Sequence, residues 1–372
     1  MKDLSHYRDE FPVVERFIYL NHAAVSPLPR RSAKAMQGLI SDVMSGGITG
    51  YPAWIETCQG LRESAAKLIS AEPEEIAITK NTSEGLSFVA NGIDWRPGDI
   101  VVAVREDFPA NVFPWKRLER CGVTVRWLEL QGGRLEFDAI DRACKGARLL
   151  AVSWAHYLSG FRLDLDAVGE ICRRRDCLLA VDAVQALGPF PTDVKKAGVH
   201  FLSASGHKWL LGPEGCGFLY IEQALQDQVE PAEFGWTNVS GFPSYSRDEE
   251  LRPDAGRYEC GTLNTVGCYG LRASIELFLE AGTENTSRQV DTLAQRLSDG
   301  VIEKGYEPMT SRDNGSGSGI VTFRKPGVDS AQTARTLAGQ RVSLAARHGW
   351  LRAAPHFYNT ADEIDQTLQL LA

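Results

Sequence analysis

Residues 177–221, CLLAVDAVQALGPFPTDVKKAGVHFLSASGHKWLLGPEGCGFLYI, decide the fold of this 372-residue chain. The stretch holds three short apolar runs, at 177–184, 199–205 and 216–221, which turns rich in glycine and proline separate. The runs are largely continuous in apolar character, which is typical of strands that are buried on both faces of a sheet. They therefore predict neighbouring strands in the interior of an α/β domain.

Four further apolar runs lie upstream, at 74–79, 99–104, 124–130 and 148–155. Helix-like stretches at 82–93, 111–121 and 163–176 separate several of them. This alternation predicts an α/β fold with a mostly parallel central sheet flanked by helices.

The alternation of apolar runs with helix-like stretches ends near residue 240. Residues 254–282 suggest a loop that runs into a long helix. Strand-like runs follow at 319–327 and 341–355, and a helix-like segment lies at the C-terminus. We therefore expect a smaller α+β domain at 241–372, a large cofactor-binding domain at 21–240, and an N-terminal arm at 1–20 that packs with the small domain.

Composition excludes several classes of protein. Hydrophobic residues make up 43% and charged residues 24% of the chain, a balance that supports a folded core. The net charge of −8 excludes the basic surface of a nucleic-acid binder. No apolar run reaches the length of a membrane span, so no membrane partner is expected.

The N-terminal residues and the cysteines predict a cytoplasmic location. The first 20 residues include early acids and no apolar signal core. Of the eight cysteines, Cys172 and Cys177 are the closest pair in the sequence, and no second pair with zinc-ligand spacing accompanies them. Reduced thiols, most of them small core hydrophobes, are the simplest interpretation.

Three sites lie where a strand ends, which is where an open parallel sheet binds its ligands. Thr82, Ser83 and Gly85 begin a predicted helix, and its exposed N–H groups with two hydroxyls suit an anion. Asp182 ends an apolar strand, and Lys208 stands in an apolar, glycine-rich stretch that favours a lowered pKa. Taken singly, each has an alternative interpretation: a helix cap, a strand-end turn residue and a surface lysine.

Taken together, the three sites fit pyridoxal 5′-phosphate (PLP). This cofactor needs a phosphate site, a carboxylate at its ring nitrogen and a lysine that forms an imine with its aldehyde. A nucleotide-binding dehydrogenase would instead show a glycine fingerprint after its first strand, where this chain has NTSEG at 81–85. A non-catalytic scaffold would have no chemical need for Lys208 or Asp182.

The sequence resembles the class V aminotransferase superfamily of fold-type I PLP-dependent transferases, in particular its cysteine desulfurase and isopenicillin N epimerase-like branch. The resemblance runs from YLNHAAVSPLP at 19–29 to RAAPHFYNTADEID at 352–365, and the combination of VDAVQALG with SGHKW and GPEGCGFLY is specific. It implies a homodimer with shared active sites that acts on a small-molecule amino acid substrate.

The resemblance also implies a role for each matching residue. Lys208 would be the Schiff-base lysine and general base, Asp182 the partner of the pyridine nitrogen, and Gln185 a hydrogen-bond partner of the cofactor's phenolic oxygen. Thr82, Ser83, Ser205 and His207 would hold the phosphate of the cofactor in their own subunit. Thr262 would reach the phosphate of the cofactor in the neighbouring subunit. Phe108 would stack on the ring, Arg352 would clamp the substrate carboxylate, and His22 and Tyr157 would border the substrate pocket.

Several of these positions have structural alternatives. Arg352 could form a surface ion pair, Thr262 could cap the following helix, and His22 and Tyr157 could serve as packing residues. Trp236 is either a wall of the pocket or a core aromatic residue.

The sequence departs from the desulfurase pattern in two places. Desulfurases carry a nucleophilic cysteine on a loop of the C-terminal domain, but the corresponding stretch here, SLAARHGWLRAAPHF at 343–357, has none. Phe108 stands where desulfurases place a ring-stacking histidine, so any proton transfer by that histidine is lost. We therefore expect a PLP-dependent aminotransferase acting at the α-carbon of an amino acid. The alternative is a C–S or C–Se lyase, or an epimerase, that lacks the desulfurase cysteine.

Overall fold

The computed structural model describes residues 3–240 and 250–371. Residues 1–2, 241–249 and 372, which include the expected domain boundary near residue 240, lie outside the described residues. Within the described ranges no helix combines the length and the hydropathy that a membrane span requires.

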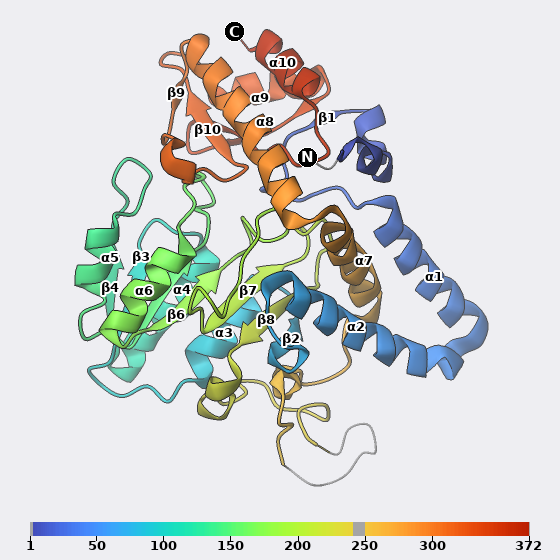
Figure 1. Cartoon of the computed structure of the whole chain (residues 1–372), viewed down its shortest axis with the longest axis vertical. Coiled ribbons are helices and arrows are strands. Elements are labelled where there is room, and N and C mark those ends of the chain that lie inside the picture. The colour runs from blue at the N-terminus through green and yellow to red at the C-terminus, as the bar shows by residue number, and fades with distance from the viewer. Residues whose placement is uncertain (1–2, 241–249, 372) are drawn as a thin grey trace.

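A seven-stranded sheet forms the centre of the larger part of the molecule (Figure 1). Its strand order is β2-β8-β7-β6-β5-β3-β4, and β8 runs antiparallel to both of its neighbours while the other pairs are parallel. The strands are β2 (Ile76–Thr79), β3 (Ile100–Val104), β4 (Thr124–Leu128), β5 (Leu149–Ser153), β6 (Leu178–Asp182), β7 (Phe201–Ser205) and β8 (Gly217–Ile221). Each of the seven apolar runs in this region forms a strand, which confirms the prediction.

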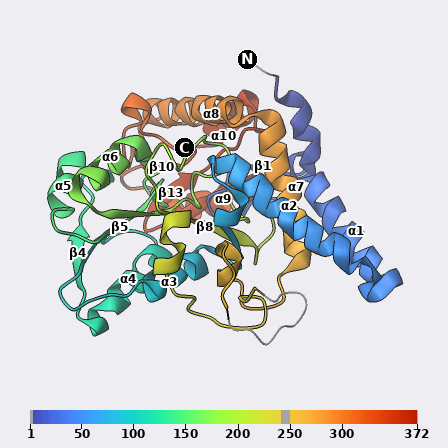
Figure 2. The ribbon, with the colours of Figure 1, turned by 60° about the horizontal axis from the view of Figure 1, so that its bottom comes forward.

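Helices cover both faces of this sheet, so the strands are buried on both sides (Figure 2). Successive residues of β6, such as Leu179 and Ala180, belong to two different apolar clusters on opposite faces. On one face lie α3 (Thr82–Gly92) and α4 (Phe113–Arg117), and on the other lie α2 (Tyr51–Ile69), α5 (Phe137–Ala143), α6 (Leu165–Arg175) and α7 (Thr265–Ala281). Double burial explains why the strand runs are continuously apolar.

A smaller domain with its own apolar core lies toward the C-terminus. Its four-stranded antiparallel sheet has the order β12-β13-β10-β9. The elements are α8 (Thr283–Glu303), β9 (Glu307–Pro308), β10 (Val321–Arg324), α9 (Ser330–Gly339), β11 (Val342–Ser343), β12 (Ala345–Arg347), β13 (Trp350–Ala353) and α10 (Ala361–Leu370). This domain lies beyond the end of the large sheet, as Figure 1 shows.

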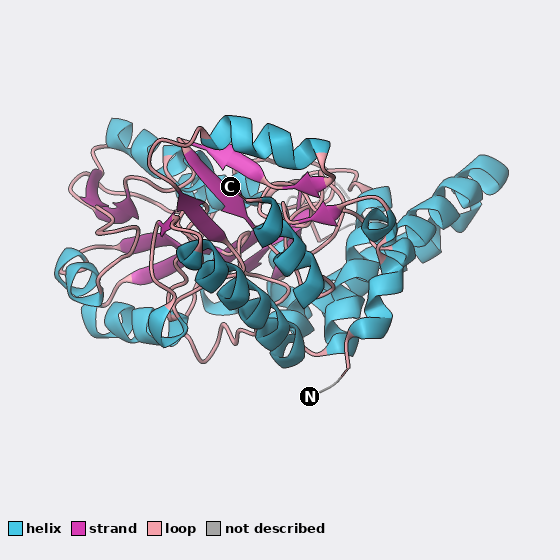
Figure 3. Cartoon of the chain, turned by 90° about the horizontal axis from the view of Figure 1, so that it is seen from above, coloured by secondary structure: helices cyan, strands magenta, loops and turns pink. Residues whose placement is uncertain are grey.

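The N-terminal segment packs against the smaller domain. Strand β1 (Ile18–Tyr19) pairs in parallel with β11, and Leu20 lies in the core of the small domain. Helix α1 (Arg30–Gly46) then runs beside α2 and α7, and the α1–α2 pair projects from the body of the molecule (Figures 1 and 3).

Candidate active site

The side chains with ionisable or hydroxyl groups lie together at the carboxyl ends of the parallel strands. Asp182 is the last residue of β6 and Ser205 the last residue of β7, while Thr82 begins α3 three residues after β2. Asp107 lies three residues beyond the end of β3. Because the parallel strands all end at one edge of the sheet, the chain brings these groups to a single site.

Asp182 is a buried carboxylate, with only 2% of the residue exposed. Its Oδ1 accepts a hydrogen bond of 3.0 Å from the Val184 N–H. Burial, together with the neighbouring Asp107 carboxylate, raises the pKa of Asp182 to about 7, while the Val184 N–H and the Lys208 cation oppose this shift. A buried acid of this kind is stabilised as an anion when a cation lies against it.

Lys208 lies in the turn after β7, where its Nζ is 5.2 Å from the centre of the Phe108 ring. Burial lowers the pKa of Lys208 to about 8, because the charged ammonium loses its hydration. Asp182 opposes this shift, whereas Arg352 and Arg347 add to it. The uncharged amine, which is the form that attacks a carbonyl carbon, is therefore more abundant near neutral pH than it is for an exposed lysine.

Thr82 and Ser205 tie the start of α3 to the end of β7. Ser205 Oγ accepts a hydrogen bond of 2.8 Å from the Thr82 N–H, and Thr82 Oγ1 accepts one of 2.9 Å from the Ser205 N–H. Gly85 permits this close packing, because a Cβ there would lie 2.3 Å from the Ser203 hydroxyl. Ser83 is exposed in the same first turn, and the N–H groups at the start of a helix suit an anion.

Two further predicted cofactor residues border this region. Gln185 is buried, and its Oε1 accepts a hydrogen bond of 2.9 Å from the Trp209 indole while its Nε2 donates one of 3.1 Å to the Ala23 carbonyl. One N–H of the Gln185 amide therefore remains for a ligand. His207 is half-buried immediately before Lys208, and its carbonyl accepts a hydrogen bond of 2.8 Å from the Ser26 N–H.

Arg352 is the buried cation of the smaller domain that faces the same site. Only 2% of the residue is exposed, and its Nη1 donates a hydrogen bond of 2.7 Å to the Tyr157 carbonyl. Its Nε and Nη2 are buried without any partner in the described part of the chain. Burial, and next the Arg347 cation, lower the pKa of Arg352 to about 10, so the side chain stays charged at neutral pH. An unpaired guanidinium edge of this kind matches a carboxylate in two-point contact.

Phe108 and Tyr157 form an aromatic wall beside Lys208. Their rings meet edge to face with centres 5.4 Å apart, and Phe108 is 39% exposed. The Asp107 carboxylate fixes the loop under Phe108, because it accepts hydrogen bonds from the Phe108 N–H at 2.7 Å, from Asn111 at 3.0 Å and from the Ser153 hydroxyl at 2.8 Å. A flat apolar ring at this position can stack on a heterocycle.

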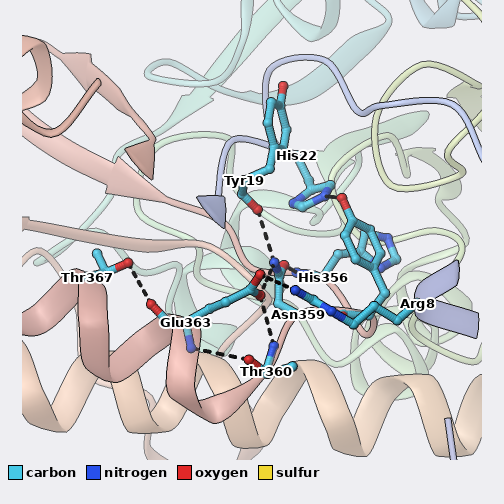
Figure 4. Close-up of polar contacts among 9 residues, drawn as sticks. Arg8, Tyr19, His22, His356, Asn359, Thr360, Glu363 and Thr367 are labelled. Carbon is cyan, nitrogen blue, oxygen red and sulfur yellow. Dashed lines mark hydrogen bonds and ion pairs between the residues drawn. The ribbon is translucent and has the colours of Figure 1, made fainter. Parts of the chain in front are cut away.

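His22 lies in a buried network between the N-terminal arm and the smaller domain (Figure 4). Its Nδ1 lies 2.7 Å from the Ala354 carbonyl and its Nε2 lies 2.6 Å from the Tyr358 hydroxyl, so both ring nitrogens are engaged. Burial lowers the pKa of His22 to about 4. In this arrangement both nitrogens of the ring are already hydrogen-bonded within the protein, whereas Tyr157 lies against Phe108.

Thr262 lies close to the start of α3 within one chain, because it lines a small pocket together with Thr79, Lys80 and Glu84. It is exposed in the loop before α7 and lines a surface pocket of about 390 Å³ together with Tyr51 and Trp236. The sequence analysis also missed two residues at the site, Asp107 and Arg347. Asp107 lies in the loop after β3, and Arg347 lies in the edge strand β12. Neither residue belongs to a sequence motif that would mark it as part of the site.

The site as a whole fits PLP. A buried carboxylate, a lysine of lowered pKa and a helix start with hydroxyls supply the three contacts that this cofactor requires. The unpaired edge of Arg352 adds a place for a carboxylate of the substrate. The geometry therefore defines a PLP-dependent enzyme with the fold-type I architecture.

The chain belongs to the family described as "Aminotransferase class-V", whose profile matches residues 18–367. It is 31% identical to the uncharacterized aminotransferase YcbU of Bacillus subtilis, over 99% of this chain and 97% of the relative. It is 28% identical to a probable cysteine desulfurase of Pyrococcus abyssi, over 98% and 96% of the two chains. It is also 29% identical to isopenicillin N epimerase of Streptomyces clavuligerus, over 95% and 94%.

Solved structures show the same fold. The apo cysteine desulfurase of Thermococcus onnurineus aligns with a TM-score of 0.92 at 27% identity, covering 100% of this chain and 97% of that chain. A C-DES variant with glycine covalently linked to its PLP cofactor aligns with a TM-score of 0.91 at 22% identity, covering 100% and 99%. These findings confirm the expected family, fold class and PLP cofactor, while the roles of individual residues stay predictions.

Proposed function

We propose that this enzyme transfers the amino group of an α-amino acid to a keto acid. The observation that carries the proposal is the buried guanidinium of Arg352, whose unpaired Nε and Nη2 face the site that also holds Lys208. A substrate that carries an α-carboxylate satisfies those donors and brings its α-carbon toward the lysine.

Bound PLP supplies an electron sink for the bonds of the substrate α-carbon. Asp182 holds a negative charge against the ring nitrogen, and Phe108 stacks on the ring. Thr82, Ser83, Ser205 and His207 hold the phosphate, and Gln185 donates its remaining N–H to the ring oxygen. Lys208 would take up and return the proton of the substrate α-carbon, since its lowered pKa suits a general base near neutral pH.

Two features of the site favour amino transfer over sulfur mobilisation. The hairpin of β12 and β13, which carries Arg352, holds no cysteine to accept sulfur. Phe108 has no exchangeable proton, so it cannot protonate a leaving group or a second face of the substrate. Lys208 alone suffices for amino transfer, because a single base can remove the proton of the substrate α-carbon and return a proton on the same face of the substrate.

The test is a single-turnover assay of the holoenzyme against a panel of amino acids without a keto acid acceptor. We expect one equivalent of keto acid per chain, no ammonia, and loss of the visible band of the cofactor. Addition of a keto acid should restore the band. Multiple turnovers with release of ammonia would instead establish a lyase, and racemised substrate would establish an epimerase.

We also infer a cytoplasmic homodimer with shared active sites. The exposed side chains of Met44 (82%) and Ile48 (76%) give the projecting end of α1 and α2 an apolar surface. Such a surface suits contact with a second copy. Thr262 is exposed on the same flank, where it can reach the phosphate site of the partner subunit, and the eight free cysteines suit a reducing compartment.

Sedimentation velocity of the holoenzyme tests the dimer. We expect the native chain to sediment with twice the mass of one chain, and the Met44→Glu, Ile48→Glu double variant to shift toward the monomer because both charges would be buried at the interface. Native protein that sediments as a monomer at micromolar concentration would contradict the inference.

A further inference from the structure

Three cysteine thiols converge beside α6, at the opposite end of β6 from Asp182. The Sγ atoms of Cys144, Cys172 and Cys177 all lie within 4.8 Å of one another. All three residues are buried, with 0%, 0% and 4% exposed. Cys172 and Cys177 lack a zinc-type partner pair in the sequence, and the fold supplies a third thiol from a residue 172 − 144 = 28 positions upstream.

The backbone fixes the three thiols independently of any ligand. Cys144 ends α5, where its N–H donates to the Ile140 carbonyl at 2.9 Å. Cys172 lies in α6, and the Cys177 N–H donates to the Cys172 carbonyl at 3.0 Å across the end of that helix. The cluster is therefore preorganised, and a ligand would not have to order the chain around it.

The three thiols differ in their readiness to carry charge, because hydrogen bonds to Cys144 raise the pKa of Cys172 and of Cys177. Hydrogen bonds from the Cys172 and Cys177 thiols lower the pKa of Cys144 well below the usual range for a thiol, and the Arg126 cation adds to this shift. Arg126 is anchored over the end of α5, where its Nη1 donates to the Lys145 carbonyl at 3.1 Å. The hydrogen bond to Asp141 raises the pKa of Arg175, and the nearby Cys144 adds a smaller contribution. Thiolate is the form of cysteine that binds metals.

The donor set selects a soft ion with a low coordination number. Thiolates select ions such as monovalent copper and zinc. Structural zinc sites are tetrahedral with four protein ligands, whereas the cluster contains three potential ligands within the described ranges. The carboxylate of the nearby Asp141 already accepts hydrogen bonds of 3.1 Å from both Arg174 and Arg175. Metal–sulfur bonds of about 2.3 Å around a trigonal ion place the sulfur atoms roughly 4 Å apart, so the thiols would close in only slightly.

We propose that Cys144, Cys172 and Cys177 bind one monovalent copper ion in a trigonal thiolate site. Binding releases the thiol protons to solvent, and no oxidation or reduction accompanies it. The site lies at the start of β6, while Asp182 lies at the end of that strand. Asp182 lies five positions after Cys177 along the extended strand, which is a distance of roughly 17 Å. Copper binding is therefore separate from the PLP chemistry, and the proposal does not depend on the proposed function.

The test is a competition for copper between the holoenzyme and a coloured copper(I) chelator, under anaerobic conditions with ascorbate as reductant. We expect the native chain to withdraw one equivalent of copper and to gain ultraviolet thiolate-to-copper absorption. Each of the variants Cys144→Ala, Cys172→Ala and Cys177→Ala should weaken binding more than about 10-fold, because each removes a ligand. Thermal unfolding of each variant, followed without copper, verifies that it is folded.

Buried cysteines outside the cluster provide the matched control. Cys58→Ala and Cys268→Ala remove equally buried thiols and should leave the copper affinity unchanged. The proposal is overturned if the native holoenzyme leaves the copper on the chelator, or if the control variants weaken binding as much as the cluster variants. A disulfide within the cluster in air-purified protein, found by mass spectrometry, would assign the thiols to oxidation instead and would also overturn it.

Discussion

Replacement of Lys208 by alanine is expected to abolish the covalent attachment of PLP and to lower turnover by roughly 10⁴-fold, the upper end of what one positioned acid–base group contributes. The effect is large because one nitrogen serves both as the covalent anchor and as the base at the α-carbon. Its pKa of about 8 suits both tasks near neutral pH. The measurement is the visible spectrum of the purified variant, together with its rate on the best amino acid of the native enzyme.

Borohydride reduction followed by peptide mass spectrometry identifies the anchor directly. In native protein the PLP adduct should be found on the peptide that contains Lys208. Lys196→Ala serves as the control, because Lys196 is exposed and pairs with Asp166 on the surface. An adduct on another lysine, or full activity of the Lys208→Ala variant, would refute the assignment.

Replacement of Asp182 by asparagine is expected to lower kcat/KM by roughly 10²–10³-fold. Asparagine keeps the shape and the hydrogen bond to Val184 but not the charge that holds the ring nitrogen of the cofactor protonated. A loss of this size corresponds to about 3–4 kcal/mol, within the range of roughly 3–5 kcal/mol that removal of one partner from a buried charge pair costs. Steady-state kinetics measure the effect, and a far-ultraviolet circular dichroism spectrum that matches the native apoprotein shows that the fold is intact.

The same variant carries a second, pH-dependent signature. Uptake of PLP by native apoprotein should accelerate as the pH rises through about 8, because only the uncharged Lys208 amine attacks the aldehyde. Asp182 raises the pKa of Lys208, so in the Asp182→Asn variant the midpoint should move to lower pH. A Ser83→Ala variant removes no charge, so it should keep the native midpoint. A variant midpoint at or above the native value would contradict the coupling.

The central sheet could be predicted because its physical cause is local. A strand covered on both faces must be apolar at every position, and runs such as 178–181 show this without any knowledge of neighbours. The cofactor residues could be predicted for a similar reason, since Asp182 and Ser205 stand at strand ends, where ligands of such sheets bind.

The remaining features depend on contacts between distant parts of the chain. Asp107 is one acid among many in the sequence, and its burial under the Phe108 loop follows from Ser153 on the neighbouring strand. The engagement of both His22 nitrogens depends on residues more than 330 positions away. The copper proposal likewise rests on Cys144, which no spacing rule connects to Cys172.

The arm at the N-terminus has a mechanical consequence. Arg8 donates a hydrogen bond of 2.9 Å to the Tyr358 carbonyl and pairs with Glu363 at 2.7 Å, and β1 joins β11. The chain thus leaves the small domain after Leu20 and returns to it at Gly282, so two separate crossings of the backbone join the domains. The hydrogen bonds from Arg352 to the Tyr157 carbonyl and from Thr322 to the Leu158 carbonyl add further ties to the loop after β5. The guanidinium at position 352 is therefore held in place against the large domain before any substrate binds.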